Sequence, residues 1–183
     1  MRDDTIKFMK DDDIKFYEWY NEKINGMDKS LKYSGTVDFS DKVVISDPCY
    51  KTFNFCNVWL KVKPGKWDYE ININSQGRPK YLKVTHSDNK IISFSEYPTL
   101  TGLGVDSGTI SIIGKITWCN KFDNEERHDY FWRAVRKNYP GKVFNDCVAT
   151  STGGDISTDV FLVHDEENKI VGIKISLLGY DED

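Results

Sequence analysis

The sequence predicts a β-rich α+β fold: a mainly antiparallel twisted sheet or two-sheet sandwich with two flanking helices. Three observations lead to this prediction. Most of the chain consists of short runs rich in β-branched and aromatic residues, a composition typical of strands. Turn-forming residues separate these runs so closely that parallel crossovers, which need about a dozen residues or more, do not fit. Only two segments repeat apolar residues at the spacing of a helix.

The two helices are expected over residues 12–25 and 124–138. The acidic run Asp11–Asp13 favours the start of the first helix, and Gly26 ends it. An acidic residue also precedes the second helix, and Pro140-Gly141 stops it. In both segments apolar residues recur every three or four positions, so each helix has one face for packing.

The remaining runs are the predicted strands. In chain order they are Thr36–Phe39, Val43–Ser46, Val58–Val62, Trp67–Ile73, Tyr81–His86, Ile91–Ser95, Leu103–Asp106, Thr109–Ile113, Val143–Thr150, Asp159–His164 and Ile170–Leu177. The turns between them are expected at Asp41-Lys42, Pro64-Gly65, Gln76-Gly77, Asp88-Asn89, Ser107-Gly108 and Glu167-Asn168. Because the chain has 183 residues and no Pro/Ser-rich linker, we expect a single domain over 1–183.

The charge balance limits the kind of ligand. Lys and Arg number 25 and Asp and Glu 29, a net charge of −4, which argues against a general duplex-DNA binder. Residues 31–122 carry 12 basic and 8 acidic side chains, net +4, so an anionic small ligand would be held most easily there. Solvated lysines on outward strand positions explain the same excess without any ligand.

The compartment is expected to be cytoplasmic. No apolar stretch approaches the roughly 20 residues that cross a bilayer, and the charged N-terminus has no apolar core of a secretory signal. The four cysteines, Cys49, Cys56, Cys119 and Cys147, form no CxxC pair. We therefore expect reduced thiols, no structural zinc, no other metal or cofactor, and no membrane partner.

The usual catalytic signatures are missing from the sequence. It contains no GxxxxGK[ST], GxSxG or HExxH motif, and only His86, His128 and His164 are available for imidazole acid–base chemistry. Cys49 has no histidine with a reason to be adjacent. The sequence therefore leans away from an enzyme.

Three polar segments at strand ends are candidates for a site. Ser46–Tyr50 places a carboxylate, a thiol and a phenol where Pro48 ends a strand. Thr101–Thr109 and Ala149–Asp155 combine glycines with hydroxyl and carboxyl side chains, so their backbones can approach a ligand and offer N–H groups to an anion. The alternatives are an Asx-type turn, a plain hairpin turn and a surface loop, respectively.

Aromatic residues gather in or beside the positive central strands. They are Trp59, Trp67, Tyr69, Tyr81, Tyr97 and Trp118. An aromatic face with lysines suits a base or ribose-phosphate ligand, through stacking and charge. Core packing is the alternative for each ring.

The ordered motifs resemble those of a family of bacterial and phage proteins of unknown function. The matching text is Val44–Tyr50 after a Ser-Gly-x-Val start, Val62–Trp67 and Gly104–Gly108, within residues 32–178. The family's later Ser-Gly-x-Gly-Asp-Gly is degenerate here, since Ile156 replaces the last Gly. The resemblance implies a β-rich fold and a prokaryotic or viral origin, but no activity.

The sequence thus leads to a non-catalytic protein that holds an anionic, nucleotide-type ligand, for example to sequester a host signalling nucleotide. The expected ligand-binding residues are Asp47, Tyr50, Trp59, Trp67, Asp106, Ser107, Thr152, Gly153 and Asp155. One alternative is a hydrolase in which Asp47, Asp106 and Asp155 bind Mg²⁺ or Ca²⁺. Another is a protein-interaction module that presents an aromatic edge strand. A homo-oligomer is compatible with all three.

Overall fold

The structure is a computed structural model that describes residues 32–49, 57–74, 78–89, 93–122 and 125–177. The helix expected at 12–25, the turn at Gln76-Gly77 and the site candidate Tyr50 lie outside the described residues.

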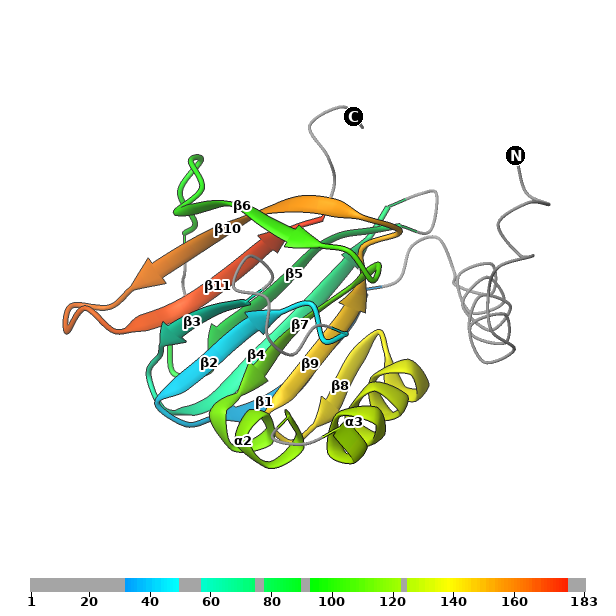
Figure 1. Ribbon diagram of the computed structural model, residues 1–183. Coiled ribbons are helices and arrows are strands. Elements are labelled where there is room, and N and C mark those ends of the chain that lie inside the picture. Colours follow the sequence, from blue (N-terminus) through cyan, green and yellow to red (C-terminus); the bar gives the residue numbers. More distant parts are fainter. Residues whose placement is uncertain (1–31, 50–56, 75–77, 90–92, 123–124, 178–183) are drawn as a thin grey trace.

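Eleven strands form two antiparallel sheets in the described chain (Figure 1). Sheet A has the order β1-β4-β5-β11-β10-β6, and sheet B the order β3-β2-β7-β9-β8. The strands are β1 Lys32–Phe39, β2 Lys42–Ser46, β3 Asn57–Lys61, β4 Gly65–Ile73, β5 Pro79–His86, β6 Leu100–Val105, β7 Thr109–Gly114, β8 Gly141–Phe144, β9 Cys147–Ser151, β10 Ile156–His164 and β11 Ile170–Ser176. The predicted fold class is confirmed, in its two-sheet form.

Two helices, α2 Lys115–Phe122 and α3 Glu125–Asn138, follow β7 without a long linker. Phe131 and Val135 of α3 pack with Val44 and Ala149 of sheet B, and Trp118 of α2 joins the edge of this cluster. The helices therefore cover one face of sheet B, and the predicted second helix is confirmed as α3.

The main core fills the space between the sheets. Every second residue of each strand points inward, as the period of a strand requires, so Val43 and Ile45 of β2 meet Val84 and Ile173 of sheet A. The molecule thus has three layers: sheet A, sheet B and the helices. Because the helices cover sheet B, the outer face of sheet A is the sheet face that no described element covers.

Three details of the predicted elements were wrong. The run Val143–Thr150 is the hairpin of β8 and β9, because Asn145 and Asp146 form a turn inside it. Residues 93–95 of the predicted strand Ile91–Ser95 are not in a strand, and its first two residues lie outside the described chain. Trp118, expected in or beside a strand, lies on α2.

Candidate functional site

The structure brings the three polar segments together at one end of the sandwich. The β6–β7 connection at 106–108 and the β9–β10 connection at 152–155 both cross between the sheets there. The Thr152 N–H donates to the Gly108 carbonyl at 2.9 Å. A Cβ on Gly108 would lie 3.7 Å from Cα of Gly154, so the two bends touch. The two bends therefore lie side by side at this end of the sandwich.

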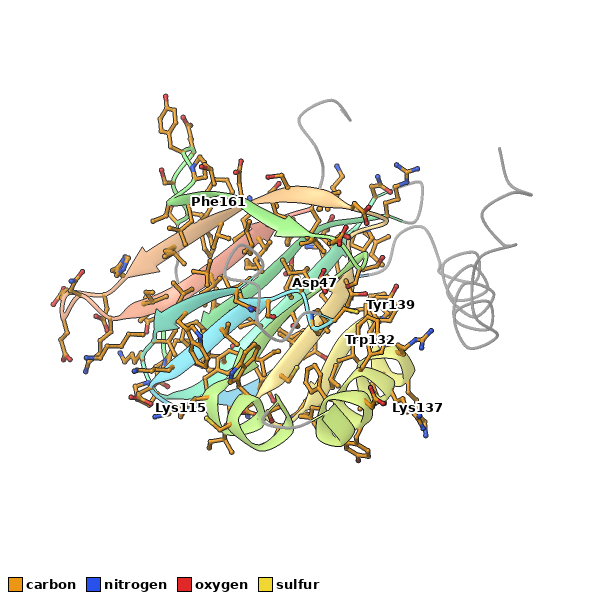
Figure 2. All side chains as sticks on the ribbon, viewed as in Figure 1. Asp47, Lys115, Trp132, Lys137, Tyr139 and Phe161 are labelled. Carbon is orange, nitrogen blue, oxygen red and sulfur yellow. The ribbon has the colours of Figure 1, made fainter. Side chains whose placement is uncertain are left out.

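Asp47, in the segment that follows β2, binds the β6–β7 connection at 106–108. Its side chain is fully buried, and Figure 2 labels it at the end of β2. Oδ2 accepts the N–H groups of Asp106 and Ser107, each at 2.8 Å. Oδ1 accepts the Ser107 hydroxyl at 2.5 Å and the Cys49 N–H at 3.0 Å. The backbone N–H groups that a ligand anion would use are therefore bonded to a carboxylate of the chain itself.

In the β9–β10 connection, too, hydrogen-bond donors are bonded to groups of the same bend. The Gly153 N–H donates to the Ser151 hydroxyl at 2.9 Å, and the Thr152 hydroxyl donates to the Gly154 carbonyl at 2.6 Å. Gly153 and Gly154 have φ values of 82° and 151° and open space at their Cβ positions, so the bend needs glycine for its backbone shape. These groups hold the junction together instead of facing a ligand.

The three aspartates are placed differently. Asp47 is enclosed by N–H and O–H donors, whereas Asp106 and Asp155 are exposed on their bends. Within the described part of the chain, no group of three or more His, Cys, Asp or Glu side chains could hold a metal ion. Carboxylates at this end also repel an anion, which makes the junction a poor place for the expected ligand.

The two candidate tryptophans differ in exposure. The Trp67 side chain is fully buried, with edge contacts to Phe39 and His86 at centroid distances of 5.6 Å, and its Nε1–H donates to the Lys63 carbonyl. Its indole is therefore part of the core and cannot stack on a ligand. Trp59 is 47% exposed on edge strand β3 and contacts Trp118 edge-on at 5.4 Å.

A second cluster lies on the outer face of sheet A, where the register aligns side chains of neighbouring strands. Glu70 faces Lys83, Lys83 faces Lys174, and Lys174 faces Phe161. The Lys174 ammonium lies 5.6 Å from the Tyr81 ring centroid and 5.2 Å from that of Phe161. We call Glu70, Tyr81, Lys83, Phe161 and Lys174 the aromatic–lysine cluster.

Electrostatic contacts fix the charges of this cluster. Glu70 accepts a hydrogen bond from the Tyr81 hydroxyl and lies 3.5 Å from the ammonium groups of both Lys32 and Lys83. Burial favours a higher pKa for Glu70, but Tyr81, Lys83 and Lys32 together lower it below its usual value. Burial, with the bond to Glu70 and its charge, raises the pKa of Tyr81 to about 12. Glu70 is therefore ionised and Tyr81 neutral around pH 7.

Lys174 differs from its neighbours in having aromatic partners. Lys83 also lies over the Tyr81 ring, at 5.8 Å, but it shares the Glu70 carboxylate. Within the described residues, no carboxylate lies in ion-pair distance of Lys174. The Lys174 ammonium thus lies against two aromatic rings, and its positive charge can bind a ligand anion.

Sequence reasoning found part of this cluster and missed the rest. Tyr81 was among the aromatic candidates, but Phe161 and Lys174 were not. The usable signal is the alternation Asp159-Phe161-Val163, which puts an aromatic residue on the polar side of β10. Which sheet face stays open depends on the helices, and the local pattern does not contain that information.

No helix in the described part of the chain is both long and apolar enough to span a membrane. Comparison with protein-family models, curated proteins and solved structures found no match to this chain, so the resemblance to bacterial and phage proteins stays a prediction.

Proposed function

We propose that the protein binds an anionic, nucleotide-type small molecule without transforming it, on the aromatic–lysine cluster of sheet A. The observation that carries the proposal is the Lys174 ammonium between the rings of Tyr81 and Phe161. A planar base can stack on an aromatic face, and a phosphate can meet the ammonium beside it.

The surrounding charges favour a small ligand over a long polyanion. The outer face of sheet A carries Lys32, Lys66, Lys83 and Lys174, but also Asp38, Asp68, Glu70 and Asp159. The charges at these eight strand positions cancel. A nucleotide can place its phosphate at Lys174 alone, whereas a nucleic-acid strand would also meet the carboxylates.

The end of the sandwich supports this function less well than sheet A does. The N–H groups of Asp106 and Ser107, which an external anion would need, already bind the Asp47 carboxylate. An incoming phosphate would have to displace that buried group and would meet the exposed carboxylates of Asp106 and Asp155. We therefore propose the ligand on sheet A and a structural role for Asp47, Ser107 and Thr152.

A release experiment separates this function from its alternatives. The purified protein is incubated with a panel of cyclic and linear nucleotides, washed and denatured, and the released molecules are identified by mass spectrometry. Intact nucleotide near one equivalent supports the proposal. Turnover that stops with a chelator would instead support the hydrolase with Asp47, Asp106 and Asp155, and no uptake of any nucleotide would overturn the proposal.

Two variants locate the ligand. Lys174→Ala removes the ammonium between the rings, so we expect the dissociation constant to rise by roughly tenfold or more. Lys66→Ala is the matched control, because Lys66 is an exposed lysine on the same face of β4, four residues from Glu70. Equal affinity in the two variants would contradict a site at the aromatic–lysine cluster.

A further inference from the structure

Edge strand β3 and helix α2 form a second exposed surface, on the helix side of sheet B. Trp59 of β3 is 47% exposed and contacts Trp118 of α2, and Ile116 on the first turn of α2 is 61% exposed. Three exposed lysines, Lys42, Lys61 and Lys115, lie in one row beside them. We call these six residues the edge surface.

The sheet register puts the lysines next to one another. Lys42 of β2 lies directly opposite Lys61 of β3. Val43 pairs with Gly114 of β7, so Lys115, the next residue, follows beside Lys42. Like charges directly opposite each other in a sheet are destabilising. No carboxylate of the described chain lies in ion-pair distance of these three lysines. Asp41 is their acidic neighbour in the sequence, so the three lysines and this aspartate together carry a net charge of +2.

The strand itself can accept a partner. β3 is the last strand of sheet B on the side away from β8 (Figure 1). Along Asn57–Lys61 no described strand pairs with its outer edge, whereas the next residue, Val62, bridges Ile170 of β11, so a partner strand has room as far as Lys61. Trp59 and Lys61 are two residues apart, so both side chains face the helix side of the sheet. An added strand would therefore place one side chain at Trp59 and, two residues away, another at Lys61.

We infer that the edge surface docks an extended acidic segment of a partner protein, which adds to sheet B along β3. An apolar side chain of that segment packs against Trp59 and Trp118, and a carboxylate two residues away meets the lysine row. Backbone hydrogen bonds to the strand edge give affinity, and the alternating side chains give specificity. Positive charge next to the exposed Trp59 indole favours an acidic partner over a second copy, which would bring two lysine rows together.

The edge surface is separate from the proposed nucleotide site. Figure 2 shows Lys115, at the start of α2, and Phe161, on sheet A, at opposite sides of the molecule. The two proposals can therefore fail independently, because a variant of one surface leaves the side chains of the other in place.

A peptide-selection experiment tests this inference with the full chain. A display library of random peptides of about twelve residues is selected against the wild-type protein, with Trp59→Ala as counter-target. We expect the selected peptides to carry Asp or Glu two positions from an aromatic or branched apolar residue. Moving the acidic residue by one position, at constant composition, should weaken binding by roughly tenfold, since the carboxylate then faces the other side of the strand.

Variants and controls decide the outcome. Binding of the selected peptides should fall about tenfold with Trp59→Ala and with Lys61→Glu, and it should persist with Tyr97→Ala. Tyr97 is the matched aromatic control, because it is 78% exposed and lies outside the edge surface. Circular dichroism of each variant checks that the fold is intact.

Three results would overturn the inference. The first is that no peptide is enriched, and the second is that enriched peptides bind the Trp59 and Lys61 variants as tightly as the wild type. The third is self-association that Trp59→Ala abolishes in sedimentation experiments, since a second copy would then occupy the edge. Charges on edge strands often serve only to prevent the association of two copies. If that is the only role of these lysines, removing them will make the protein self-associate without any loss of peptide binding, which is the second of these results.

Discussion

Asp47 shows how one residue joins distant parts of this chain. Its buried carboxylate accepts hydrogen bonds from Cys49, Asp106 and Ser107 and so connects β2 with the β6–β7 crossover. Hydrogen bonds to a charged acceptor are the stronger ones in proteins, and donors left without an acceptor in the interior are costly. Asp47 therefore contributes to stability more than an exposed aspartate does.

The first prediction concerns Asp47→Asn. The amide keeps the size of the side chain but loses the charge and turns an acceptor oxygen into a donor, so we expect a loss of about 2–4 kcal/mol in the free energy of unfolding. Urea denaturation measures it. Asp155→Asn is the control, because Asp155 is exposed on the neighbouring bend, and it should change stability by less than about 0.5 kcal/mol. Equal stability of the two variants would contradict the role of Asp47.

The polar residues at the strand ends could be predicted from the sequence, but the hydrogen bonds that join them could not. The sequence places Asp47 beside Pro48 and places glycine next to Asp106-Ser107, which indicates polar bends. Whether the turn's N–H groups face solvent or an internal carboxylate depends on contacts between residues 59 and 60 positions apart. The pattern of Trp67 likewise fits both a core residue and a ligand platform, and the packing of Phe39 and His86 around it decides for the core.

At the scale of elements, Tyr69 connects sheet A with sheet B. It extends from β4 to β8, where its hydroxyl oxygen accepts the Lys142 N–H at 3.3 Å. Two glycines make room for the ring. A Cβ on Gly35 of β1 would lie 2.7 Å from the Tyr69 hydroxyl, and one on Gly141 of β8 would lie 3.3 Å from it. The Tyr69 side chain therefore lies against strands of both sheets.

The second prediction is that Gly35→Ala destabilises the protein by about 1–3 kcal/mol, because the new methyl group overlaps the Tyr69 ring. In a Tyr69→Ala background the same change should cost much less, since the overlapping atoms are gone. Thermal or urea unfolding of the four proteins in this double-mutant cycle gives the coupling energy. Additive effects would show that Tyr69 does not cause the requirement for glycine.

The third prediction concerns pH and the pair Glu70–Tyr81. The pKa of Glu70 is lowered in the folded state, so its contribution to stability is present above its unfolded pKa and is lost as the pH falls through the folded value. Tyr81→Phe removes the hydroxyl donor, and the pKa of Glu70 should then rise toward its usual value. Carboxyl-carbon NMR titration measures this shift. Lys66→Ala should leave the titration unchanged, and an unshifted Glu70 in Tyr81→Phe would contradict the assigned contact.

Some elements could not be predicted because their determinants lie far away in the sequence. Helix α2 begins where Asp146 of the β8–β9 turn accepts the N–H of Thr117 at 3.1 Å and also its hydroxyl hydrogen bond. This cap is 29 residues away, and the helix has no acidic residue of its own in the first turn. The β8–β9 hairpin was predicted as one continuous strand, because its turn at Asn145 and Asp146 lies within an otherwise apolar run.

At the scale of the whole molecule, the layer order determines which surfaces are available. The strand pattern was sufficient for an antiparallel β-rich fold, since alternation and turn spacing are local properties. Local patterns do not say which sheet receives the helices. Because α2 and α3 cover sheet B, no described element covers the polar face of sheet A. The candidate site therefore lies at Tyr81, Phe161 and Lys174 on that face and not at the bends.

The most direct test of this account is amide NMR mapping of the ¹⁵N-labelled protein, titrated with the nucleotide that the release experiment recovers. We predict that the largest shift changes occur in β5, β10 and β11 around Lys174, and that Lys174→Ala removes them. Changes centred on residues 106–108 and 151–155, or a spectrum that no nucleotide alters, would contradict a ligand site on the open face of sheet A.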